Sequence, residues 1–371
     1  MIKVLYILST AKRCGPTNQL YNLIKYLDRS IFKPLLITLS PEPADSRSGD
    51  FEELGVELYT LGLSRLKGLF FIVSMLKRML NRLDVDITHT QGIRPDTIAA
   101  MYLDGCKTIA SLRNNPYYDY SMRYGKITGY LIALHHLRML RRIGLVVAVS
   151  NSVSTMLKER NSFTVDVVQN GADTDIFYPE VSDRHKQELR RNLGISSTGK
   201  VFISTGHLTS LKDPLTIVKA FRDNHLSRSS HIVFLGDGPE RQRCEEYGRG
   251  HNIRFFGRVP NVADYLRACD FFISASQTEG LPSATLEALA CGLPCVLSDI
   301  ESHREIARYN PAGAQLFQVR DAQSLANKVN EVLDQDYTIM SQAAVGIIRN
   351  YLNAKVMSEK YQRLYLKIYA H

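Results

Sequence analysis

Short apolar runs alternate with helical patterns along almost the whole chain, and this alternation restricts the possible folds more than any other feature of the sequence. Many of the runs are rich in Val and Ile and apolar at successive positions, which is typical of strands that are buried on both faces. Such strands belong to parallel sheets with helices on either side. In the first half the runs are Val4–Leu8, Leu35–Leu39, Val56–Leu61, Ile87–His89, Thr108–Leu112, Leu145–Val149 and Val165–Gln169, and in the second half they are Val201–Thr205, His231–Leu235, Ile253–Phe256, Phe271–Ala275, Cys295–Ser298 and Gln315–Val319. The sequence therefore predicts an α/β protein with two doubly wound parallel sheets.

The two predicted sheets belong to separate domains, and the change between them comes after Asn170-Gly171. A chain of 371 residues is long enough for two domains of ordinary size. Turn residues on both sides of a charged helical pattern place the linker near residues 175–198. We expect an N-terminal domain at residues 1–178, a C-terminal domain at residues 179–350, and a C-terminal helix at residues 351–371 that packs back on the N-terminal domain.

Composition argues against several classes of protein. The chain has no run of 18 apolar residues that would predict a membrane-spanning helix. The apolar start at Met1–Leu8 is shorter than a signal peptide and is followed by no cleavage site. The 6 cysteines form no Cys-x-x-Cys pair, which argues against a metal site or a disulfide framework and fits a reducing cytosol. We therefore expect a cytoplasmic globular protein.

The net charge of +9 suits a partner that is anionic, either nucleic acid or a membrane surface. The basic residues concentrate in two amphipathic patterns, at residues 64–82 and 126–142. Such helices can lie on anionic lipid. They can equally pack on a core with a cationic outer face, and periodicity does not separate the two interpretations. Taken together, the basic surplus favours contact with an anionic membrane surface and a peripheral location on the inner face of the plasma membrane.

Two glutamates, Glu279 and Glu287, mark a candidate site in the second half. A predicted strand at residues 271–275 precedes them and a helical pattern at residues 284–290 includes the second, so Glu279 lies in the loop between strand and helix. Ligands of open α/β sheets bind at this edge, where backbone N–H groups hold anionic or hydroxylated groups. Carboxylates are good acceptors for sugar hydroxyls, so the pair indicates a sugar-nucleotide site. The alternative is a solvated loop glutamate followed by a surface helix glutamate.

Three further motifs of the second half follow predicted strands. Lys212, with His207 five residues before it, is a point cation suited to a diphosphate. The turn Gly236-Asp-Gly-Pro lacks the third glycine of a dinucleotide fingerprint, so we interpret it as a tight turn that lets a helix approach the strand. After Gly257, the backbone of Arg258 and Val259 is placed to face a flat base.

In this order the motifs resemble the retaining glycosyltransferases of family four, which have the GT-B fold. The resemblance covers essentially the whole chain. It is carried by Gly206-x-Leu with Lys212, Gly236-Asp-Gly-Pro, Phe256-Gly257, Glu279-x7-Glu287, Glu287-Ala-x-Ala-x-Gly292-x-Pro294, Glu305, Ser150 and Asn170-Gly-x-Asp173-x-x-x-Phe177-x-Pro179. It implies two Rossmann-like domains that face a central cleft, with the nucleotide sugar bound by the C-terminal domain and the acceptor by the N-terminal domain.

The resemblance also implies a role for each candidate residue. Glu287 binds the ribose hydroxyls, Glu279 orients the donor sugar, and Lys212 neutralises the departing diphosphate. The donor-binding residues it implies are Gly15, Arg113, His207, Lys212, Arg258, Val259, Glu279, Gly280, Leu281, Pro282, Ser283 and Glu287, and the catalytic residues are Glu279, Lys212 and His89. No metal or other cofactor is implied, because a lysine and helix N-termini take its place in the family.

The chain departs from the family pattern at positions that would contact phosphate. His207 stands where the family usually has arginine, and the first loop has Cys14-Gly15 in place of two glycines. Arg113 stands where a further histidine often follows a strand, and as a cation it compensates for His207 by meeting a donor or acceptor phosphate. His89 matches the acceptor-side histidine of the family, although a histidine at a strand end can also be a satisfied core residue.

The function we expect is transfer of a hexose or N-acetylhexosamine from a nucleoside-diphosphate sugar to a growing surface glycan of the O-antigen or capsule type, carried on polyprenyl diphosphate. One alternative is a nucleotide-sugar 2-epimerase on the same fold, for which no acid/base cluster is recognisable. Another is a non-catalytic sugar-binding protein, against which the two glutamates and Lys212 argue. A nucleic-acid binder is disfavoured because no basic motif with interleaved aromatic residues occurs.

Overall fold

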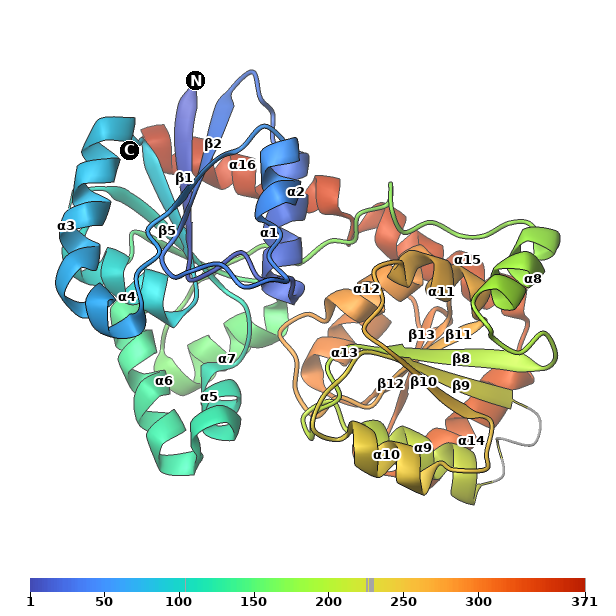
Figure 1. Ribbon diagram of the computed structural model, residues 1–371. Coiled ribbons are helices and arrows are strands. Elements are labelled where there is room, and N and C mark those ends of the chain that lie inside the picture. Colours follow the sequence, from blue (N-terminus) through green and yellow to red (C-terminus); the bar gives the residue numbers. More distant parts are fainter. Residues whose placement is uncertain (104, 225, 227–229, 371) are drawn as a thin grey trace. The chain divides into compact units, whose positions relative to one another are not determined.

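The computed structural model describes residues 1–103, 105–224, 226 and 230–370, without the side chains of residues 65–70. The chain divides into two compact units, of which the second comprises Gly171–Asn353 and the first comprises Met1–Asn170 together with the segment from Ala354 onwards (Figure 1). Each unit contains one fully parallel sheet, with seven strands in the first and six in the second. The predicted class, α/β with two doubly wound sheets, is therefore confirmed.

The first unit has the strand order β3-β2-β1-β4-β5-β6-β7. Its strands are β1 (Ile2–Leu8), β2 (Phe32–Thr38), β3 (Glu57–Thr60), β4 (Ile87–Gln91), β5 (Lys107–Leu112), β6 (Leu145–Ala148) and β7 (Asp166–Val167). Its helices are α1 (Gly15–Lys25), α2 (Ser48–Glu53), α3 (Arg65–Leu83), α4 (Ile93–Tyr102), α5 (Pro116–Tyr124), α6 (Lys126–Leu140), α7 (Asn151–Asn161) and α16 (Ala354–Ala370). Successive residues of β1 enter different cores, Leu5 and Ile7 on one face and Val4 and Tyr6 on the other. This explains why the strand is apolar at every position.

Helix α16 closes the core on the second of these faces. It packs against α1, and its Tyr361 and Tyr365 are completely buried beside Tyr6. The hydroxyl groups of Tyr365 and Tyr6 are hydrogen-bonded at 3.2 Å. The last helix of the chain is therefore an integral part of the first unit, and the chain crosses between the units after Asn170 and again before Ala354.

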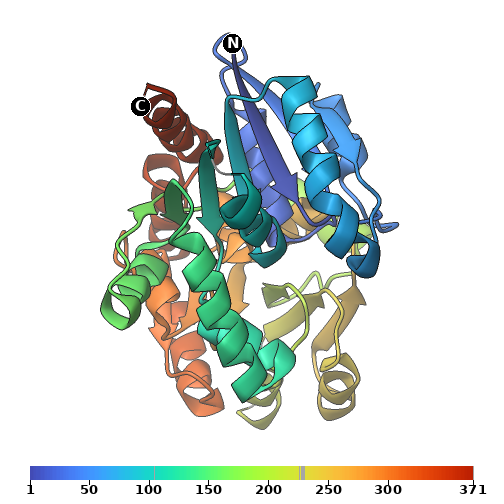
Figure 2. The ribbon, with the colours of Figure 1, turned by 90° about the vertical axis from the view of Figure 1, so that its left-hand side faces the viewer.

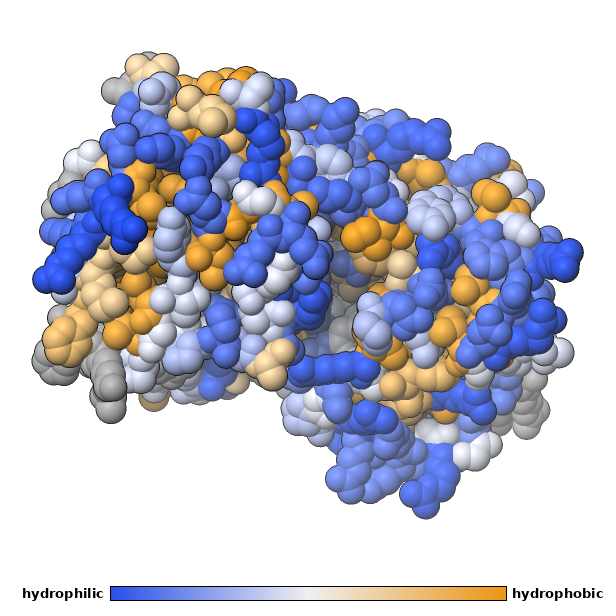
Figure 3. All heavy atoms as spheres, turned by 45° about the horizontal axis from the view of Figure 1, so that its top comes forward, coloured by the Kyte–Doolittle hydropathy of each residue, from blue (hydrophilic) through white to orange (hydrophobic). Residues whose placement is uncertain are grey.

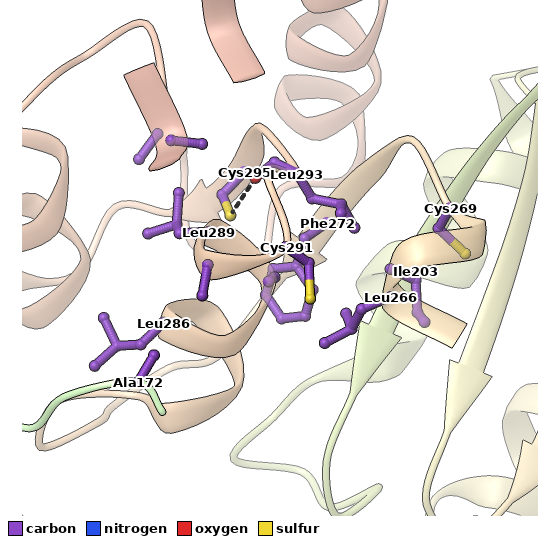
Figure 4. Close-up of a cluster of buried hydrophobic side chains, with 14 of the residues drawn as sticks. Ala172, Ile203, Leu266, Cys269, Phe272, Leu286, Leu289, Cys291, Leu293 and Cys295 are labelled. Atoms are coloured by element: carbon purple, nitrogen blue, oxygen red, sulfur yellow. Dashed lines mark hydrogen bonds between the residues drawn. The ribbon is translucent and has the colours of Figure 1, made fainter. Parts of the chain in front are cut away.

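The second unit has the strand order β10-β9-β8-β11-β12-β13. Its strands are β8 (Lys200–Thr205), β9 (Ser230–Leu235), β10 (Ile253–Gly257), β11 (Phe271–Ser274), β12 (Cys295–Ser298) and β13 (Ala314–Phe317). Its helices are α8 (Asp183–Asn192), α9 (Pro214–Asp223), α10 (Arg241–Tyr247), α11 (Val262–Ala268), α12 (Ser283–Ala290), α13 (Glu301–Ala307), α14 (Ala322–Leu333) and α15 (Tyr337–Asn350). Figure 4 shows the core on one face of this sheet, where Cys269, Cys291 and Cys295 lie among leucines as small apolar side chains. The only hydrogen bond drawn there joins Cys295 Sγ to the Leu293 carbonyl at 3.4 Å.

A buried ion cluster ties α8 to the second sheet. The carboxylate of Asp270 accepts hydrogen bonds from Lys186 Nζ at 2.7 Å, Arg190 Nη2 at 2.6 Å and the backbone N–H of Val201 at 2.7 Å. Although burial raises the pKa of Asp270, the two cations outweigh it and hold this pKa below its usual value. The charged helix that the sequence places in a linker is therefore attached to the C-terminal unit through its basic residues.

Helices α5 and α6 form an antiparallel hairpin in the first unit, which can be followed in Figures 1 and 2. The helices approach so closely at Gly129 that a Cβ atom there would lie 2.3 Å from the backbone nitrogen of Ser121. A buried polar chain holds the hairpin to α4: His136 Nε2 lies 2.8 Å from Asp96 Oδ2, and His136 Nδ1 lies 2.8 Å from Tyr120 OH. Because the carboxylate only accepts, Nε2 donates to it.

We expect Gly129→Ala to destabilise the first unit by about 1–3 kcal/mol, because the added methyl group has no space between the two helices. Gly346 provides the matched control, since it also lies in a helix but an added Cβ would have open space. Gly346→Ala should raise the free energy of unfolding by up to about 1 kcal/mol, as alanine favours helix. Urea unfolding of both variants checks the prediction, and a Gly129→Ala variant as stable as Gly346→Ala would contradict the close crossing.

None of the helices in the described residues is both long and apolar enough to cross a bilayer. On the face shown in Figure 3, apolar patches alternate with hydrophilic residues in each unit. Within the same described residues, no group of three or more His, Cys, Asp or Glu side chains is placed to hold a metal ion.

Candidate active site

The candidate site lies where the second sheet reverses its strand order. Strands β8 and β11 are neighbours, but the chain leaves β8 towards β9 on one side and leaves β11 towards β12 on the other. The loops that follow two such strands diverge and leave a crevice at the carboxyl edge, which is the usual ligand site of open α/β sheets. The β8 loop carries His207 and Lys212, and the β11 loop carries Glu279.

Lys212 and Glu279 form an ion pair across this crevice. The side chain of Glu279 is 13% exposed and that of Lys212 is 37% exposed. Ser276 Oγ donates a second hydrogen bond to the same carboxylate oxygen at 2.7 Å. Burial raises the pKa of Glu279, but Lys212 and Ser276 outweigh this effect, so the pKa is lower than usual and the carboxylate is charged at neutral pH. The site therefore offers a fixed negative acceptor beside a cation that remains accessible.

A small pocket surrounds this ion pair within the second unit. Its lining residues come from three segments that meet at the sheet edge: Ser204, Thr205, Gly206, His207, Leu208, Lys212 and Pro214; Phe272, Ser274, Ser276 and Glu279; and Pro282, Ala284 and Thr285. Hydroxyl groups are therefore more frequent at the site than the sequence motifs indicate. The serines were not singled out from the sequence, although Ser274 and Ser276 immediately precede the Glu279 loop.

Glycines shape the loop that carries His207. A Cβ atom at Gly236 would lie 1.9 Å from the Gly206 carbonyl oxygen, and one at Gly238 would lie 2.3 Å from the Leu208 carbonyl oxygen. Leu208 N–H in turn donates to the Asp237 carbonyl at 3.0 Å. The Gly236-Asp-Gly turn therefore packs its backbone directly on the β8 loop, and its glycines are needed for close approach rather than for binding a dinucleotide.

A second layer of polar groups supports the Glu279 loop. Ser298 Oγ, at the end of β12, donates to the Ser276 carbonyl at 2.5 Å. His303 Nδ1 lies 2.8 Å from the Ser298 carbonyl, so this nitrogen carries the proton. Burial lowers the pKa of His303 to about 4, and the nearby Glu279 only partly opposes this shift. His303 is therefore a neutral residue behind the ion pair.

The remaining candidates of the second unit lie around the pocket. Glu287 is half-buried in α12, and Gly280, Leu281 and Pro282 are buried just before this helix, whose first residue is Ser283. His207 is exposed and lines the pocket. Arg258 is exposed and Val259 half-buried, directly after β10. The pocket thus brings together His207, Lys212, Glu279 and Pro282, whereas Gly280, Leu281, Ser283, Glu287, Arg258 and Val259 are not part of its lining.

The candidates of the first unit lie at the carboxyl edge of its own sheet. Gly15 is the first residue of α1, and Arg113 follows β5. His89 is completely buried within β4, with Nδ1 2.7 Å from Tyr365 OH and Nε2 2.8 Å from Ser111 Oγ. A histidine that is enclosed in this way has no ring nitrogen left for a substrate. The geometry does not support the predicted catalytic role of His89, and we assign it instead to the attachment of α16.

The two enclosed histidines should make the protein acid-sensitive. Burial lowers the pKa of His89 from 6.5 to about 3, and Arg113 adds to the shift. Between pH 6.5 and about 4, these two histidines, His89 and His303, bind protons in the unfolded chain but stay neutral in the folded protein. The free energy of unfolding therefore falls as the pH falls. Each histidine changes the free energy of unfolding by up to about 1.4 kcal/mol per pH unit in this range.

A His89→Gln variant should therefore show a smaller loss of unfolding free energy between pH 6.5 and 4.5 than the unchanged protein, by about 1 kcal/mol per pH unit. Urea unfolding at a series of pH values measures this slope. His135→Gln, at an exposed position of α6, is the matched substitution. An identical slope in His89→Gln and the unchanged protein would show that His89 titrates normally in the folded state.

The chain has two doubly wound units, and a lysine–carboxylate pair lies where the second sheet reverses its strand order. These features place it in the class of two-domain α/β proteins to which GT-B enzymes belong. Residues 14–176 match the family described as Glycosyltransferase Family 4, and residues 185–346 match the family described as Glycosyl transferases group 1. The chain belongs to the family 4 glycosyltransferases, a family of retaining hexosyltransferases.

Similar proteins of known name support this assignment. The chain is 29% identical to the putative teichuronic acid biosynthesis glycosyltransferase TuaC of Bacillus subtilis over 58% of this chain and 55% of that protein. It is 29% identical to a UDP-Gal:alpha-D-GlcNAc-diphosphoundecaprenol alpha-1,3-galactosyltransferase of Escherichia coli over 54% of each chain. These matches span about half the length of the two relatives, whereas the Escherichia coli O-antigen biosynthesis glycosyltransferase WclY matches over 99% of both chains at 20% identity.

Solved structures show the same fold. Anabaena HepE in complex with UDP-glucose superposes with a TM-score of 0.82 at 18% identity, covering 99% of this chain and 100% of that chain. WaaG, a glycosyltransferase involved in lipopolysaccharide biosynthesis, superposes with a TM-score of 0.76 at 14% identity, covering 97% and 99% of the two chains. At these identities the likeness concerns the fold, and it confirms the GT-B architecture that the motifs imply.

Proposed function

We propose that this glycosyltransferase transfers a hexose or N-acetylhexosamine from a nucleoside-diphosphate sugar to a cell-surface glycan that is carried on polyprenyl diphosphate. The observation that carries the proposal is the Lys212–Glu279 pair at the carboxyl edge of β8 and β11. Several relatives are named for surface-glycan synthesis, and the named acceptor of one is linked to diphosphoundecaprenol. HepE has been crystallised with UDP-glucose, which supports a nucleotide-sugar donor.

In this proposal the two members of the ion pair act on different parts of the donor. Glu279 accepts hydrogen bonds from hydroxyl groups of the donor sugar and orients its anomeric carbon. Lys212 moves from Glu279 to the diphosphate as negative charge develops on the leaving group, which is where a preorganised cation lowers the barrier most. A substrate that adds negative charge near Lys212 competes with Glu279 for the same ammonium group, so donor binding and release of the carboxylate are coupled.

The other residues hold the donor in place. Glu287 accepts hydrogen bonds from ribose hydroxyls, and Arg258 and Val259 lie against the base. The segment Gly280–Ser283 leads into α12, so its backbone N–H groups support sugar and phosphate oxygens at the helix start. His207 adds one donor for a phosphate oxygen, because it is exposed in the pocket beside Lys212.

A donor screen tests this function directly. Thermal shifts with UDP-, GDP-, ADP- and dTDP-sugars identify the nucleotide, because a ligand that binds only the folded protein raises the melting temperature. The preferred donor is then incubated with bacterial membranes and, separately, without acceptor. Sugar transferred to the lipid fraction supports the proposal. Conversion of the nucleotide sugar to an epimer without acceptor would instead identify a 2-epimerase, and no turnover under either condition would contradict catalysis.

The hairpin α5–α6 supports the proposed contact with an anionic membrane surface. Its two helices expose a run of large apolar and aromatic side chains: Tyr118, Met122, Tyr124, Ile127, Tyr130, Leu131 and Leu134. Ile127 is 80% exposed and Leu131 is 60% exposed. Lys126 and Arg138 are also exposed in α6. Apolar and aromatic side chains flanked by cations are typical of helices that lie in the lipid headgroup region.

The sequence left open whether this basic helix packs on the core or faces lipid. In the structure the helix packs on the core through Leu137 and Leu140, while Ile127 and Leu131 are exposed and available for contact with lipid. Among the described side chains of α3, Phe71 is exposed, whereas Ile72, Leu76 and Leu80 are buried in the core, so this part of α3 presents less apolar surface than the hairpin. We therefore place the membrane contact on α5–α6.

We expect an Ile127→Asp, Leu131→Asp double variant to bind vesicles that contain anionic lipid about tenfold more weakly or worse. The variant loses two exposed apolar side chains and gains two negative charges, which the anionic lipid repels. Co-sedimentation with phosphatidylglycerol vesicles measures this, and neutral vesicles and high salt should weaken binding of the unchanged protein. Ile339→Asp, at an exposed apolar position of α15, is the matched control. Equal binding by all variants would rule out this face.

A further inference from the structure

The carboxyl edge of the first sheet holds a guanidinium group without an acidic partner. Arg113 Nε donates to Gln91 Oε1 at 3.1 Å, and Arg113 Nη1 donates to Asn170 Oδ1 at 2.9 Å. Among the described residues, no carboxylate lies within ion-pair distance of Arg113. Arg113 is half-buried, and this burial lowers the pKa of its guanidinium group. A cation in such a position is costly unless a ligand or another group compensates for it.

Two hydrogen-bond donors of this group have no partner. Arg113 Nη2 and Gln91 Nε2 are both buried and unbonded. The orientation of the amide is fixed, because the guanidinium can only donate and must therefore face the amide oxygen. Gln91 is 7% exposed, so solvent does not readily satisfy its NH₂ group. Buried donors in folded proteins almost always have partners, so an adjacent pair without one indicates space for an acceptor.

The position of the pair in the fold also points to a ligand. Strands β1 and β4 are neighbours, and the chain continues from β1 towards β2 and from β4 towards β5, in opposite directions along the sheet. Gln91 is the last residue of β4 and Arg113 follows β5, so both lie at the edge where open α/β sheets bind ligands. Cys14 is the N-cap of α1, and α1 follows β1, the neighbour of β4, so this helix begins at the same edge of the sheet. The positive end of this helix dipole therefore adds to the same site.

We propose that Arg113 Nη2 and Gln91 Nε2 bind a phosphoryl group of a substrate at the start of α1. Every contributing group is a donor or a positive dipole, which matches an oxyanion and opposes a cationic ligand. Gln91 and Asn170 occupy two sides of the guanidinium and fix its plane, so that Nη2 is left for the ligand. The source of the phosphoryl group rests on the proposed function: it is either the diphosphate of the nucleotide sugar or the diphosphate of the lipid-linked acceptor.

Cys14 provides a reporter for this site. It is exposed at the N-terminus of α1, and Cys106 is exposed elsewhere in the same unit. The rate of alkylation of each thiol by iodoacetamide, followed by mass spectrometry of the two peptides, separates a local effect from a general one. Inorganic pyrophosphate should slow the alkylation of Cys14 in a saturable manner and leave that of Cys106 unchanged. Equal rates for Cys14 with and without pyrophosphate would overturn the site.

Substitutions connect the protection to the two donors. Gln91→Leu and Arg113→Met should each raise the pyrophosphate concentration for half-protection by about tenfold or more, as expected for loss of a hydrogen bond to a charged group. Arg308→Met, at an exposed position of the second unit, is the control and should leave it unchanged. If circular dichroism shows that Arg113→Met is unfolded, the half-protection values of Gln91→Leu and Arg113→Lys test the assignment instead. Unchanged half-protection in the folded variants would overturn the assignment.

The same assay distinguishes the two sources. Half-protection by UDP, GDP, ADP and dTDP is compared with half-protection by geranyl diphosphate, a short water-soluble isoprenyl diphosphate. Protection at lower concentration by a nucleotide assigns the site to the donor, and protection at lower concentration by geranyl diphosphate assigns it to the acceptor. Failure of all of these compounds to protect Cys14 in a protein that still transfers sugar would remove this site but not the proposed function. Protection of Cys14 in a protein that transfers no sugar would support this site and contradict the proposed function.

Discussion

A Glu279→Gln variant is expected to lose about two to three orders of magnitude in kcat, as is typical when a group that acts in the transition state is removed. The substitution keeps the shape of the side chain but removes the charge that holds Lys212. The amide also loses half of its acceptor capacity for sugar hydroxyls and presents donors to the ammonium group of Lys212. Steady-state kinetics with the preferred donor measure kcat and KM separately.

Two further variants make the Glu279 result specific. Glu287→Ala should mainly weaken donor binding, with a smaller effect on kcat at saturating donor, because its proposed partners are ribose hydroxyls remote from the reacting carbon. Glu246→Gln, at an exposed glutamate of α10 that accepts a hydrogen bond from Gln242, should be neutral. If Glu279→Gln retained the turnover of the unchanged protein, the site assignment would be wrong, whatever the effect of Glu287→Ala.

Removal of the Asp270 carboxylate is expected to lower the free energy of unfolding by about 3–5 kcal/mol. In Asp270→Ala the guanidinium of Arg190, which is 3% exposed, stays buried and keeps the Ala268 carbonyl as a partner, but it loses its counter-charge. The backbone N–H of Val201 loses its acceptor as well, at the start of the strand that leads to Lys212. Urea unfolding followed by circular dichroism measures the loss.

The contrast with an exposed ion pair isolates the effect of burial. Glu245 pairs with Arg241 on the surface of α10, and its side chain is 44% exposed. Glu245→Ala should change the free energy of unfolding by less than about 1 kcal/mol, because exposed pairs contribute little. An Asp270→Ala loss of the same small size would show that the buried cluster is compensated by water, and that α8 is held to the sheet mainly by apolar contacts.

Local patterns predicted the strands because burial on both faces leaves a strong signal. Each predicted apolar run overlaps a strand, and the ends differ by a few residues at most, as for β7, which is limited to Asp166–Val167. The resemblance to family 4 added the order of the motifs and placed Lys212 and Glu279 at neighbouring strand ends. It did not show that these two residues would pair directly, because a contact between loops 67 positions apart depends on the strand order.

The side-chain partners explain what the sequence could not indicate. His89 lies inside β4, and its two ring nitrogens are hydrogen-bonded to Ser111 and to Tyr365, which is 276 positions away in the sequence. Gln91 gave no signal, since a glutamine after a strand is common and its unbonded NH₂ group is visible only in three dimensions. The helical pattern of residues 126–142 likewise could not show that Ile127 would be 80% exposed. In each case the deciding contact is made by a residue that is distant in sequence.

Helix α16 has a consequence for biosynthesis. The first unit needs Tyr361 and Tyr365 to fill its interior, and both come after the entire second unit along the chain. A ribosome therefore delivers the second unit complete while the first still has an open apolar surface where α16 will dock. The usual order of maturation, in which the domain made first finishes first, is reversed here. Until α16 has been made and has docked, that surface is a natural target for chaperones.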